Sequence, residues 1–416
     1  MDREEFLRQF DDDYRDDFEE EQQKKREQKP RRRYSKKEIE EIRKKKKKQL
    51  LFRRAGIILA LLLIVFLVVV LIVKAVQAMI KPSEEQTAEE AVAPTEKADP
   101  YPYASVFNRP QIADDKKTEG HYSSQNGDYY IYNNMALDTF SGDEGSAQSY
   151  ADTISGFKKN APDLTVYNMV VPSHIEYAVP QRLIDSGSVT TNSQADYINN
   201  IFHDYSEDVV PINCYNKLSE HVADYLFFNT DNQITALGGY YAYTAFAEQT
   251  NQRTLNLEKC SDKTIDRYEG GLSYTDDSVA SHPDTIYYWT FPYETIAERT
   301  ASMNEEPYEL PIFYEDEESG TLAYGVFLWG DAALFVETNE DIDSDKKIAV
   351  VKENSANSLV SYLTADYKEV HIIDYRYFTG SVKSYCEKNG ITEVLFINNT
   401  LSANNEEALS DLRKIY

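Results

Sequence analysis

The run from Ala55 to Val73 constrains the chain more than any other stretch, because it holds 19 consecutive residues without a charged side chain. A helix of about 20 apolar residues spans the hydrocarbon core of a bilayer. A cleaved signal peptide would have a shorter apolar core near the N-terminus, whereas 54 residues precede this run. The run therefore predicts an uncleaved signal-anchor, a transmembrane helix over residues 55–76, and disfavours the alternative of a cleaved signal peptide.

Charged residues differ in sign on the two sides of this run. Residues 1–54 contain 20 Lys and Arg against 15 Asp and Glu, and the remainder contains 24 against 56. Lysines and arginines crowd the N-terminal flank, from Arg43 to Arg54, and the positive-inside rule then predicts a cytoplasmic N-terminus and an extracytoplasmic body. The negative excess of that body, 56 minus 24, would repel phosphates, so no nucleic-acid partner is expected.

Composition divides the chain into four segments. Residues 1–54 form charged blocks that cannot bury a core, and they predict a cytoplasmic tail. After the transmembrane helix, Pro, Ala, Glu and Thr dominate residues 77–105, which predicts an extended extracytoplasmic linker. A folded domain is expected over 106–416, so the predicted location is the cell membrane, crossed once.

Within residues 106–416, apolar strand patterns alternate with helical patterns. Strands are expected at 164–171, 209–212, 334–336, 347–351, 370–374 and 394–397, and helices at 194–205, 215–225, 355–363, 381–389 and from 405 onward. Such alternation with short links predicts the α/β class, with a mostly parallel sheet and helices on both faces. Residues 252–325 are rich in Tyr and Thr and predict an antiparallel excursion.

The stretch 225–248 carries the clearest candidate site. An apolar run at 226–228 predicts a short strand, a polar turn follows at 229–233, and apolar residues then recur at helical spacing. Thr230 or Asp231 is expected to cap that helix. Asp231 and Gln233 would then lie at the end of a strand, where open α/β sheets bind their ligands.

Two segments of the sequence resemble a known family. The first reads Thr-Asp-Asn-Gln-Ile-Thr over 230–235 and Gly-Gly-Tyr-Tyr-Ala-Tyr over 238–243, close to T-D-H-H-W-T-x-x-G-A-Y-Y-A-Y. The second reads Lys-Glu-Asn-Ser-Ala-Asn-Ser over 352–358, close to K-D-S-Y-A-N-S, and 367–377 is close to Y-K-E-I-H-x-I-D-x-R-Y. Both patterns are those of the DHHW family, membrane-anchored SGNH-hydrolase-like proteins of bacterial envelopes that are similar to the alginate O-acetylation proteins. The resemblance implies an SGNH-like fold, and it implies work on envelope polysaccharide acylation beside a membrane-bound O-acyltransferase.

The residues that would carry this family's chemistry are replaced. In the resemblance, Gln233 takes the place of the catalytic histidine, Asn354 that of the serine, and Glu353 that of the acid before it, while Asp231 is kept. An amide does not titrate near neutral pH, and asparagine is no nucleophile in acyl transfer. Two losses in separate segments predict a retired site, a pseudoenzyme. The expected vestigial and binding residues are Asp231, Gln233, Glu353, Asn354, Ser355 and Asn357.

An active site built from neighbouring residues is the alternative. Ser355 lies one residue from the serine position, although a helix N-cap or first-turn serine is its ordinary role. His174 follows a strand that ends at Pro172 and Ser173, so we expect it near the same rim as a substitute base or as a solvated loop histidine. His371 lies inside a strand and is expected to be packed there.

Cofactor and metal sites are not expected. No two histidines have helical metal-site spacing, and Cys214, Cys260 and Cys386 are too scattered for a zinc site or a disulfide framework, so buried thiols are expected. The acidic run 341–345 lacks the glycine and the closing glutamate of a calcium loop. The sequence therefore favours a non-catalytic protein that binds or scaffolds an envelope glycan or its O-acylation machinery. The alternatives are an active O-acyltransferase or esterase using Ser355, and a sensor whose cytoplasmic tail meets a partner.

Overall fold

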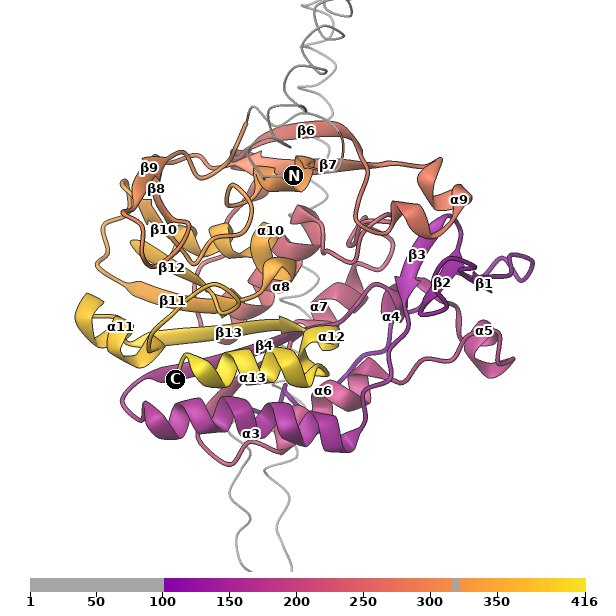
Figure 1. Ribbon diagram of the computed structural model, residues 1–416, viewed down its shortest axis with the longest axis horizontal. Coiled ribbons are helices and arrows are strands. Elements are labelled where there is room, and N and C mark those ends of the chain that lie inside the picture. The colour runs from indigo at the N-terminus through magenta and orange to yellow at the C-terminus, as the bar shows by residue number, and fades with distance from the viewer. Residues whose placement is uncertain (1–100, 316–319, 321) are drawn as a thin grey trace, which may run out of the picture. The chain divides into compact units, whose positions relative to one another are not determined.

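An eight-stranded sheet forms the centre of the computed structural model, which describes residues 101–416 except 316–319 and 321 (Figure 1). Its strands, in spatial order, are β5 (Val209–Ile212), β4 (Thr165–Val171), β13 (Glu393–Asn399), β11 (Lys347–Lys352), β12 (Glu369–Asp374), β10 (Leu334–Asn339), β8 (Thr295–Thr300) and β9 (Tyr308–Leu310). The first five run parallel, and β10, β8 and β9 continue the sheet in antiparallel pairs. The predicted mostly parallel sheet is therefore present.

Helices cover both faces of this sheet. The register aligns Phe396 of β13 with Asn168 of β4, and Leu395 with Tyr167, so Phe396 and Tyr167 point to opposite faces. Phe396 packs edge-on against Phe157 of α3 (Glu144–Asn160), with ring centroids 4.9 Å apart. Tyr167 packs against Phe246 of α8 (Ala236–Gln249) at 5.3 Å. Figure 1 shows α3 and α13 (Glu406–Lys414) on one side of the strands, with α8 and α10 (Asn357–Val360) on the other.

Further strands lie outside the central sheet. β6 (Ser261–Tyr268) and β7 (Asp284–Thr290) pair antiparallel within the predicted excursion, and β1 (His121–Tyr122), β2 (Tyr129–Tyr132) and β3 (Met135–Asp138) form a small sheet of their own. The β2–β3 hairpin contacts the polar turn directly, because Ala136 N donates to Asn229 O at 2.9 Å. This small sheet and α3 were not anticipated from the sequence.

Three local expectations were wrong. The predicted strand at 226–228 is only a one-residue bridge, Phe227 to Ile234, because the polar turn folds the chain back on itself at once. Thr235 caps α8, its hydroxyl accepting from Gly238 N at 3.1 Å, since Thr230 and Asp231 have other partners. The helix expected over 355–363 is broken into the 3₁₀ turn η4 (Asn354–Ala356), α10, and the 3₁₀ turn η5 (Ser361–Ala365).

The membrane and linker predictions fall largely outside the described residues. The tail (1–54), the transmembrane helix (55–76) and residues 77–100 of the linker all precede the described part. Among the residues that are described, no helix combines the length and the apolar character needed to cross a bilayer. The last linker residues contact the domain, where Asn213 Nδ2 donates to Tyr103 O at 3.1 Å.

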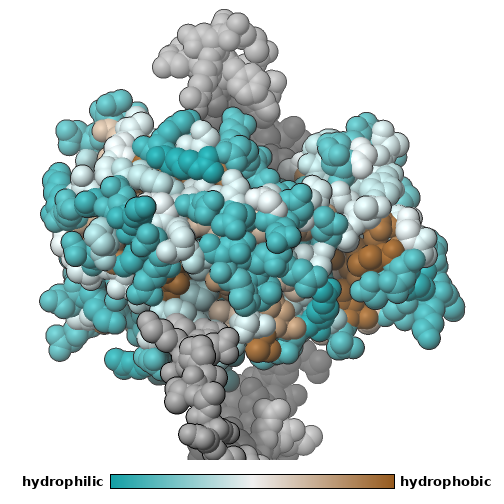
Figure 2. Space-filling view, turned by 90° about the horizontal axis from the view of Figure 1, so that it is seen from below, coloured by the Kyte–Doolittle hydropathy of each residue, from teal (hydrophilic) through white to brown (hydrophobic). Residues whose placement is uncertain are grey.

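The face of the described domain that Figure 2 shows is mostly hydrophilic. Its largest apolar area is on the side where α4 (Ile175–Ala178) and α5 (Gln181–Asp185) lie in Figure 1. A cavity of about 540 Å³ lies between these helices, residues 109–112 and residues 191–196, and its lining mixes isoleucine, valine and proline with a larger number of polar and charged side chains, among them Arg109 and Glu176. It contains no residue of either family-like segment.

Candidate functional site

The two family-like segments meet where the parallel strands end. β11 ends at Lys352, and the turn that follows leads into α10. Ser358 Oγ of α10 donates to Ile234 O, 124 residues away, at 2.8 Å. Tyr362 OH donates to Ala236 O at 3.0 Å. These bonds end on backbone carbonyls, so they fix the path of the 230–235 loop beside the end of β11.

Glycine in the first segment permits this approach. A Cβ atom on Gly239 would lie 3.1 Å from both Leu359 Cα and Ser358 O, so α8 and α10 pack backbone to backbone there. A Cβ atom on Gly238 would lie only 2.3 Å from Leu226 O. The paired glycines of the motif therefore have a packing reason that is independent of any catalytic chemistry.

A cavity of about 490 Å³ opens between the two segments, and we call it the amide cavity. Asn232 and Gln233 line it from the first segment, and Glu353 and Asn354 line it from the second. The remaining walls come from the ends of β12 and β13 and from α12 (Thr400–Ala403) and α13. They include Tyr375, Arg376, Asn399, Asn405, Glu407 and Asp411. The structure thus gathers at one sheet edge the positions that the sequence predicted to be close.

Gln233 faces the cavity with an unsatisfied side chain. The residue is 6% exposed, and its Nε2 donates to Asn232 Oδ1 at 3.3 Å. Its Oε1 is buried and has no hydrogen-bond partner. Leaving a buried acceptor unpaired costs about 1–3 kcal/mol, so this oxygen favours a bound donor.

Asp231 does not line the amide cavity and is not a helix cap, contrary to the expectations from sequence. Its Oδ2 accepts from Tyr268 OH and from Gly271 N, both at 2.8 Å, and its Oδ1 accepts from Gln233 N at 3.1 Å. Burial raises the pKa of Asp231, and these hydrogen bonds partly offset that rise. Gly270 allows the contact, because a Cβ atom there would lie 2.4 Å from Thr230 O. Asp231 therefore stabilises the 229–233 turn through bonds to residues outside the cavity.

Ser355 and Asn357 are also turned away from the cavity. Ser355 Oγ donates to Glu353 Oε1, and its backbone N donates to Glu353 Oε2 at 2.7 Å. Asn399 N reaches the same carboxylate at 3.3 Å. Asn357 Oδ1 accepts from Lys352 Nζ at 2.7 Å. Of the expected binding residues, Gln233, Glu353 and Asn354 line the cavity, and Asp231, Ser355 and Asn357 support it.

A buried ion network supports the second segment, and the sequence analysis did not assign it a role. Lys352 Nζ lies 3.0 Å from Asp374 Oδ2, and the two side chains are 2% and 0% exposed. Arg376 lies 2.7 Å from Asp374 and 2.9 Å from Asp331. Burial alone would raise the pKa of Asp374, but the charges of Lys352 and Arg376 hold it below its ordinary value. The Asp-x-Arg pattern at 374–376 was the feature of the sequence that could have indicated this network.

None of the six histidines, all within the described residues, lines the amide cavity. His174 stacks on Phe227 at 5.2 Å and lines a separate cavity of about 300 Å³, because α4 begins directly after it and turns it inward. Burial lowers the pKa of His174 to about 4. It is therefore neither a solvated loop residue nor a partner of Ser355. His371 is packed as expected, between Tyr385 OH at 2.8 Å and Glu369 at 3.0 Å.

The groups that line the amide cavity can form hydrogen bonds, and no histidine stands among them to pair with a serine. Within the described residues no group of three or more His, Cys, Asp and Glu is placed to hold a metal ion. Cys214 and Cys386 are buried thiols, whereas Cys260 is partly exposed, and all three are free. The polar groups that face the amide cavity are amides, carboxylates, a guanidinium, a phenol and a serine hydroxyl, Ser402.

Comparison with known proteins agrees with this geometry. A family model described as "DHHW protein" matches residues 109–373, and no curated protein matches the chain. A DHHW family protein from Eubacterium siraeum shares 24% identity with a TM-score of 0.64, over 71% of this chain and 99% of that one. Two structures of Bacillus cereus PatB1, one with a sulfonyl adduct, share 16% and 17% identity with TM-scores of 0.54 and 0.55. They cover 69% and 72% of this chain and 97% and 100% of theirs, and all three structures support the fold. Because the family match spans more than half of the chain and includes both segments that form the amide cavity, the chain belongs to the DHHW family.

Proposed function

We propose that this chain is a non-catalytic member of the DHHW family that binds a cell-envelope glycan in the amide cavity. One observation carries the proposal. Gln233 and Asn354 hold the places of the motif's histidine and serine, and both face the cavity, which no histidine lines. Acyl transfer by a serine needs a base to accept the hydroxyl proton, and neither amide does so.

The cavity suits a ligand rich in hydroxyl groups. Asparagine and glutamine side chains each provide two N–H donors and a carbonyl acceptor. Asn232, Gln233, Asn354, Asn399 and Asn405 together give the walls both kinds of group. The orphaned Gln233 Oε1 gains a partner when a hydroxyl enters. Leu401, Ala408 and Tyr375 add apolar surface for a sugar ring.

A membrane anchor would place this activity outside the cell. The uncharged run 55–73 and the basic residues before it support a single span with a cytoplasmic N-terminus. The family resemblance supports a membrane-bound O-acyltransferase as the partner. In this proposal the chain holds the glycan near that enzyme and takes no part in the chemistry.

Glycan binding by the full chain in detergent tests the proposal. Isothermal titration with envelope polysaccharide fractions should give saturable binding, and Gln233→Ala and Asn354→Ala should each weaken it. Gln148→Ala, on the exposed face of α3, is the matched amide control and should leave binding unchanged. Equal affinity in all four proteins would show that the cavity is not the binding site.

An active esterase or acyltransferase remains the second candidate, because the Ser355 hydroxyl has a carboxylate partner in Glu353. One PatB1 structure carries a sulfonyl adduct, so a sulfonyl fluoride is a suitable probe. The non-catalytic proposal expects no mass increase and no hydrolysis of acetyl esters. An adduct that disappears in Ser355→Ala would establish the catalytic alternative.

A further inference from the structure

The amide cavity carries an excess of negative charge. Glu353, Glu407 and Asp411 line it, and Arg376 is the one cationic side chain among its lining residues, which gives a formal charge of −2. A ligand that enters therefore meets three carboxylates and a single guanidinium.

The neighbouring ion pairs leave this excess in place. Arg376 is bound to Asp374 and Asp331, so its charge is already neutralised. Lys414 pairs with Asp411 at 2.6 Å, and Lys352 pairs with Asp374. These pairs add two cations, Lys352 and Lys414, and two anions, Asp331 and Asp374, to the surroundings of the cavity. The formal charge of the cavity and its neighbours therefore stays at −2.

Glu407 is the most available of the three carboxylates. Glu353 accepts hydrogen bonds from Ser355 and Asn399 and is 4% exposed. Glu407 is exposed in the first turn of α13, and no ion pair involves it within the described residues. A cationic group at the mouth of the cavity would meet Glu407 first.

One residue that lines the cavity also has an acceptor without a donor. Gln233 Oε1 is buried without a partner in a residue that is 6% exposed. A carboxylate group offers only acceptors, whereas hydroxyl and ammonium groups both offer donors. The negative charge and the unpaired acceptor are therefore two separate observations that both disfavour a carboxylate ligand.

We propose that the amide cavity binds a saccharide with a free amino group, a protonated hexosamine unit, and discriminates against uronic-acid or phosphate-bearing glycans. This specificity rests on the glycan-binding function proposed above. The ammonium group would be placed among Glu407, Asp411 and Glu353, while hydroxyl groups pair with the amides. Like charges brought together on binding are costly, so an anionic saccharide is rejected.

Three saccharides of equal length test the specificity with the full chain in detergent. They are a glucosamine oligomer, its fully N-acetylated counterpart and an oligo-uronate. Titrations are run at mildly acidic pH, where the amino group of glucosamine is protonated and carries a positive charge. Each exposed charge pair adds only a little affinity, but the ammonium group would meet three carboxylates, so the glucosamine oligomer should bind roughly tenfold more tightly than the N-acetylated one. The oligo-uronate should bind weakest, and added salt should reduce the differences.

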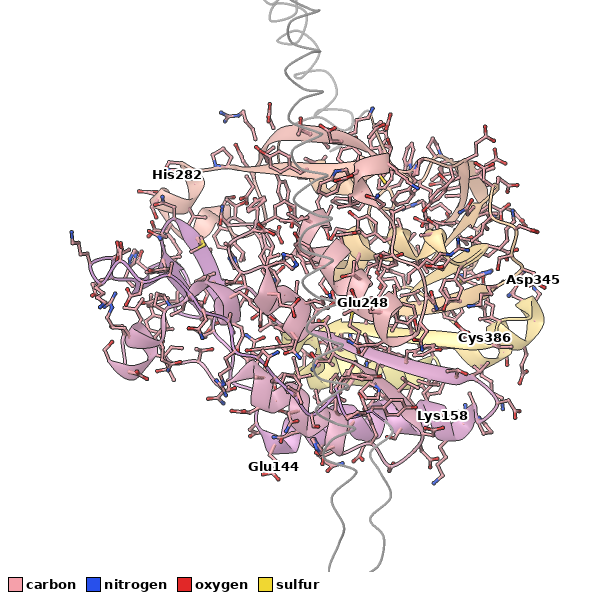
Figure 3. The ribbon with its side chains drawn as sticks, turned by 180° about the vertical axis from the view of Figure 1, so that it is seen from behind. Glu144, Lys158, Glu248, His282, Asp345 and Cys386 are labelled. Atoms are coloured by element: carbon pink, nitrogen blue, oxygen red, sulfur yellow. The ribbon has the colours of Figure 1, made fainter. Side chains whose placement is uncertain are left out.

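Two charge-neutralising variants locate the effect. Glu407→Gln should lower the preference for the glucosamine oligomer several-fold. Asp345→Asn removes an equally exposed acid that precedes β11, at the opposite end of the strand that leads to the cavity, and Figure 3 labels its position. It should leave the preference unchanged. An equal effect of both variants would assign the preference to the overall charge of the domain and overturn the proposal.

The outcomes separate this inference from the function on which it rests. Equal affinity for all three saccharides overturns the amine specificity and leaves glycan binding standing. Binding of none of them overturns both. An oligolysine of equal charge that competes as well as the glucosamine oligomer would show recognition of ammonium groups alone, which also overturns the proposal.

Discussion

Glu337 is a fully buried carboxyl group whose ionisation opposes folding. Its Oε1 accepts from Ser361 Oγ at 2.6 Å, its Oε2 has no partner, and burial raises its pKa to about 8. The folded protein therefore holds a proton that the unfolded chain releases near its ordinary pKa. The stability associated with this proton is complete below about pH 4.3 and is lost as the pH rises through 8.

Glu337→Gln should remove this loss, because an amide of the same shape carries no proton to lose. At pH 7 the variant should be more stable than the parent, with a gain on the order of 3–4 kcal/mol. Urea midpoints measured from pH 5 to pH 8 check the slope. Glu309→Gln, an exposed glutamate on β9, is the control. A parent whose midpoint does not fall between these pH values would contradict the buried, protonated state.

Restoring both lost residues tests whether the site is retired. Gln233→His combined with Asn354→Ser should allow weak acetyl-ester hydrolysis and labelling by a sulfonyl fluoride, since the binding groups of a site can outlast its triad. The rate should stay low, because Asp231 is engaged by Tyr268 and Gly271. Each single change should be inactive. Hydrolysis by the unmodified chain at the same rate would refute the retired-site hypothesis.

At the scale of elements, the Lys352–Asp374 pair links β11 to β12 beneath the cavity. Lys352→Met leaves the buried Asp374 with only Arg376, and breaking a buried pair typically costs about 3–5 kcal/mol. Lys347→Met, at the start of the same strand, removes a partly exposed pair with Glu369 and should cost less than about 1 kcal/mol. Chemical denaturation of both variants measures the difference. Similar losses would mean that the buried pair contributes no more than a surface one.

Gly239 tests the contact between α8 and α10. The added Cβ of Gly239→Ala would press on Leu359 Cα and Ser358 O, and such overpacking costs about 1–3 kcal/mol. If the proposed glycan binding is correct, glycan affinity should fall as well, because α8 and α10 carry the two segments that line the cavity. Gly145→Ala in α3 meets only Asp143 Oδ1, at 3.5 Å, and should be neutral or stabilising. A lower free energy of unfolding in Gly239→Ala, with no decrease in Gly145→Ala, would support close packing of α8 against α10.

The sequence predicted the parallel strands well and the loops poorly. β5 has the expected bounds, and β11, β12 and β13 differ by one or two residues, because continuous apolar runs mark strands that are buried on both faces. The run at 226–228 is apolar as well, but it forms only the bridge between Phe227 and Ile234. Its partner comes from the chain just after the tight turn and not from a neighbouring strand of the sheet. Local pattern does not distinguish these two cases.

The candidate site was predictable only in part. Spacing and motif order placed Gln233, Glu353 and Asn354 together correctly. The direction of each side chain could not be predicted, because it depends on partners distant in sequence, such as Tyr268 for Asp231 and Phe227 for His174. The charge of the cavity was also hidden, since Glu407 and Asp411 come from α13, outside both motifs.

For the whole molecule, the predicted orientation has a direct test. A protease added outside intact cells should remove epitopes in residues 101–416, and a tag at residue 1 should stay protected, because the basic flank of the apolar run favours the cytoplasmic side. Permeabilised cells, in which both epitopes are lost, are the control. Protection of the C-terminal domain in intact cells would reverse the orientation.

The bonds that hold the two motifs together end on main-chain carbonyls, those of Ile234 and Ala236. These bonds do not depend on which side chains the 230–235 loop carries. Residues at 232, 233 and 354 can therefore be exchanged by mutation without repacking the frame, so a change of ligand, or a loss and regain of catalysis, needs few mutational steps. The backbone of the 230–235 loop is thus held in place whichever side chains it presents. The side chains that face the cavity can therefore change in evolution much faster than the path of the loop.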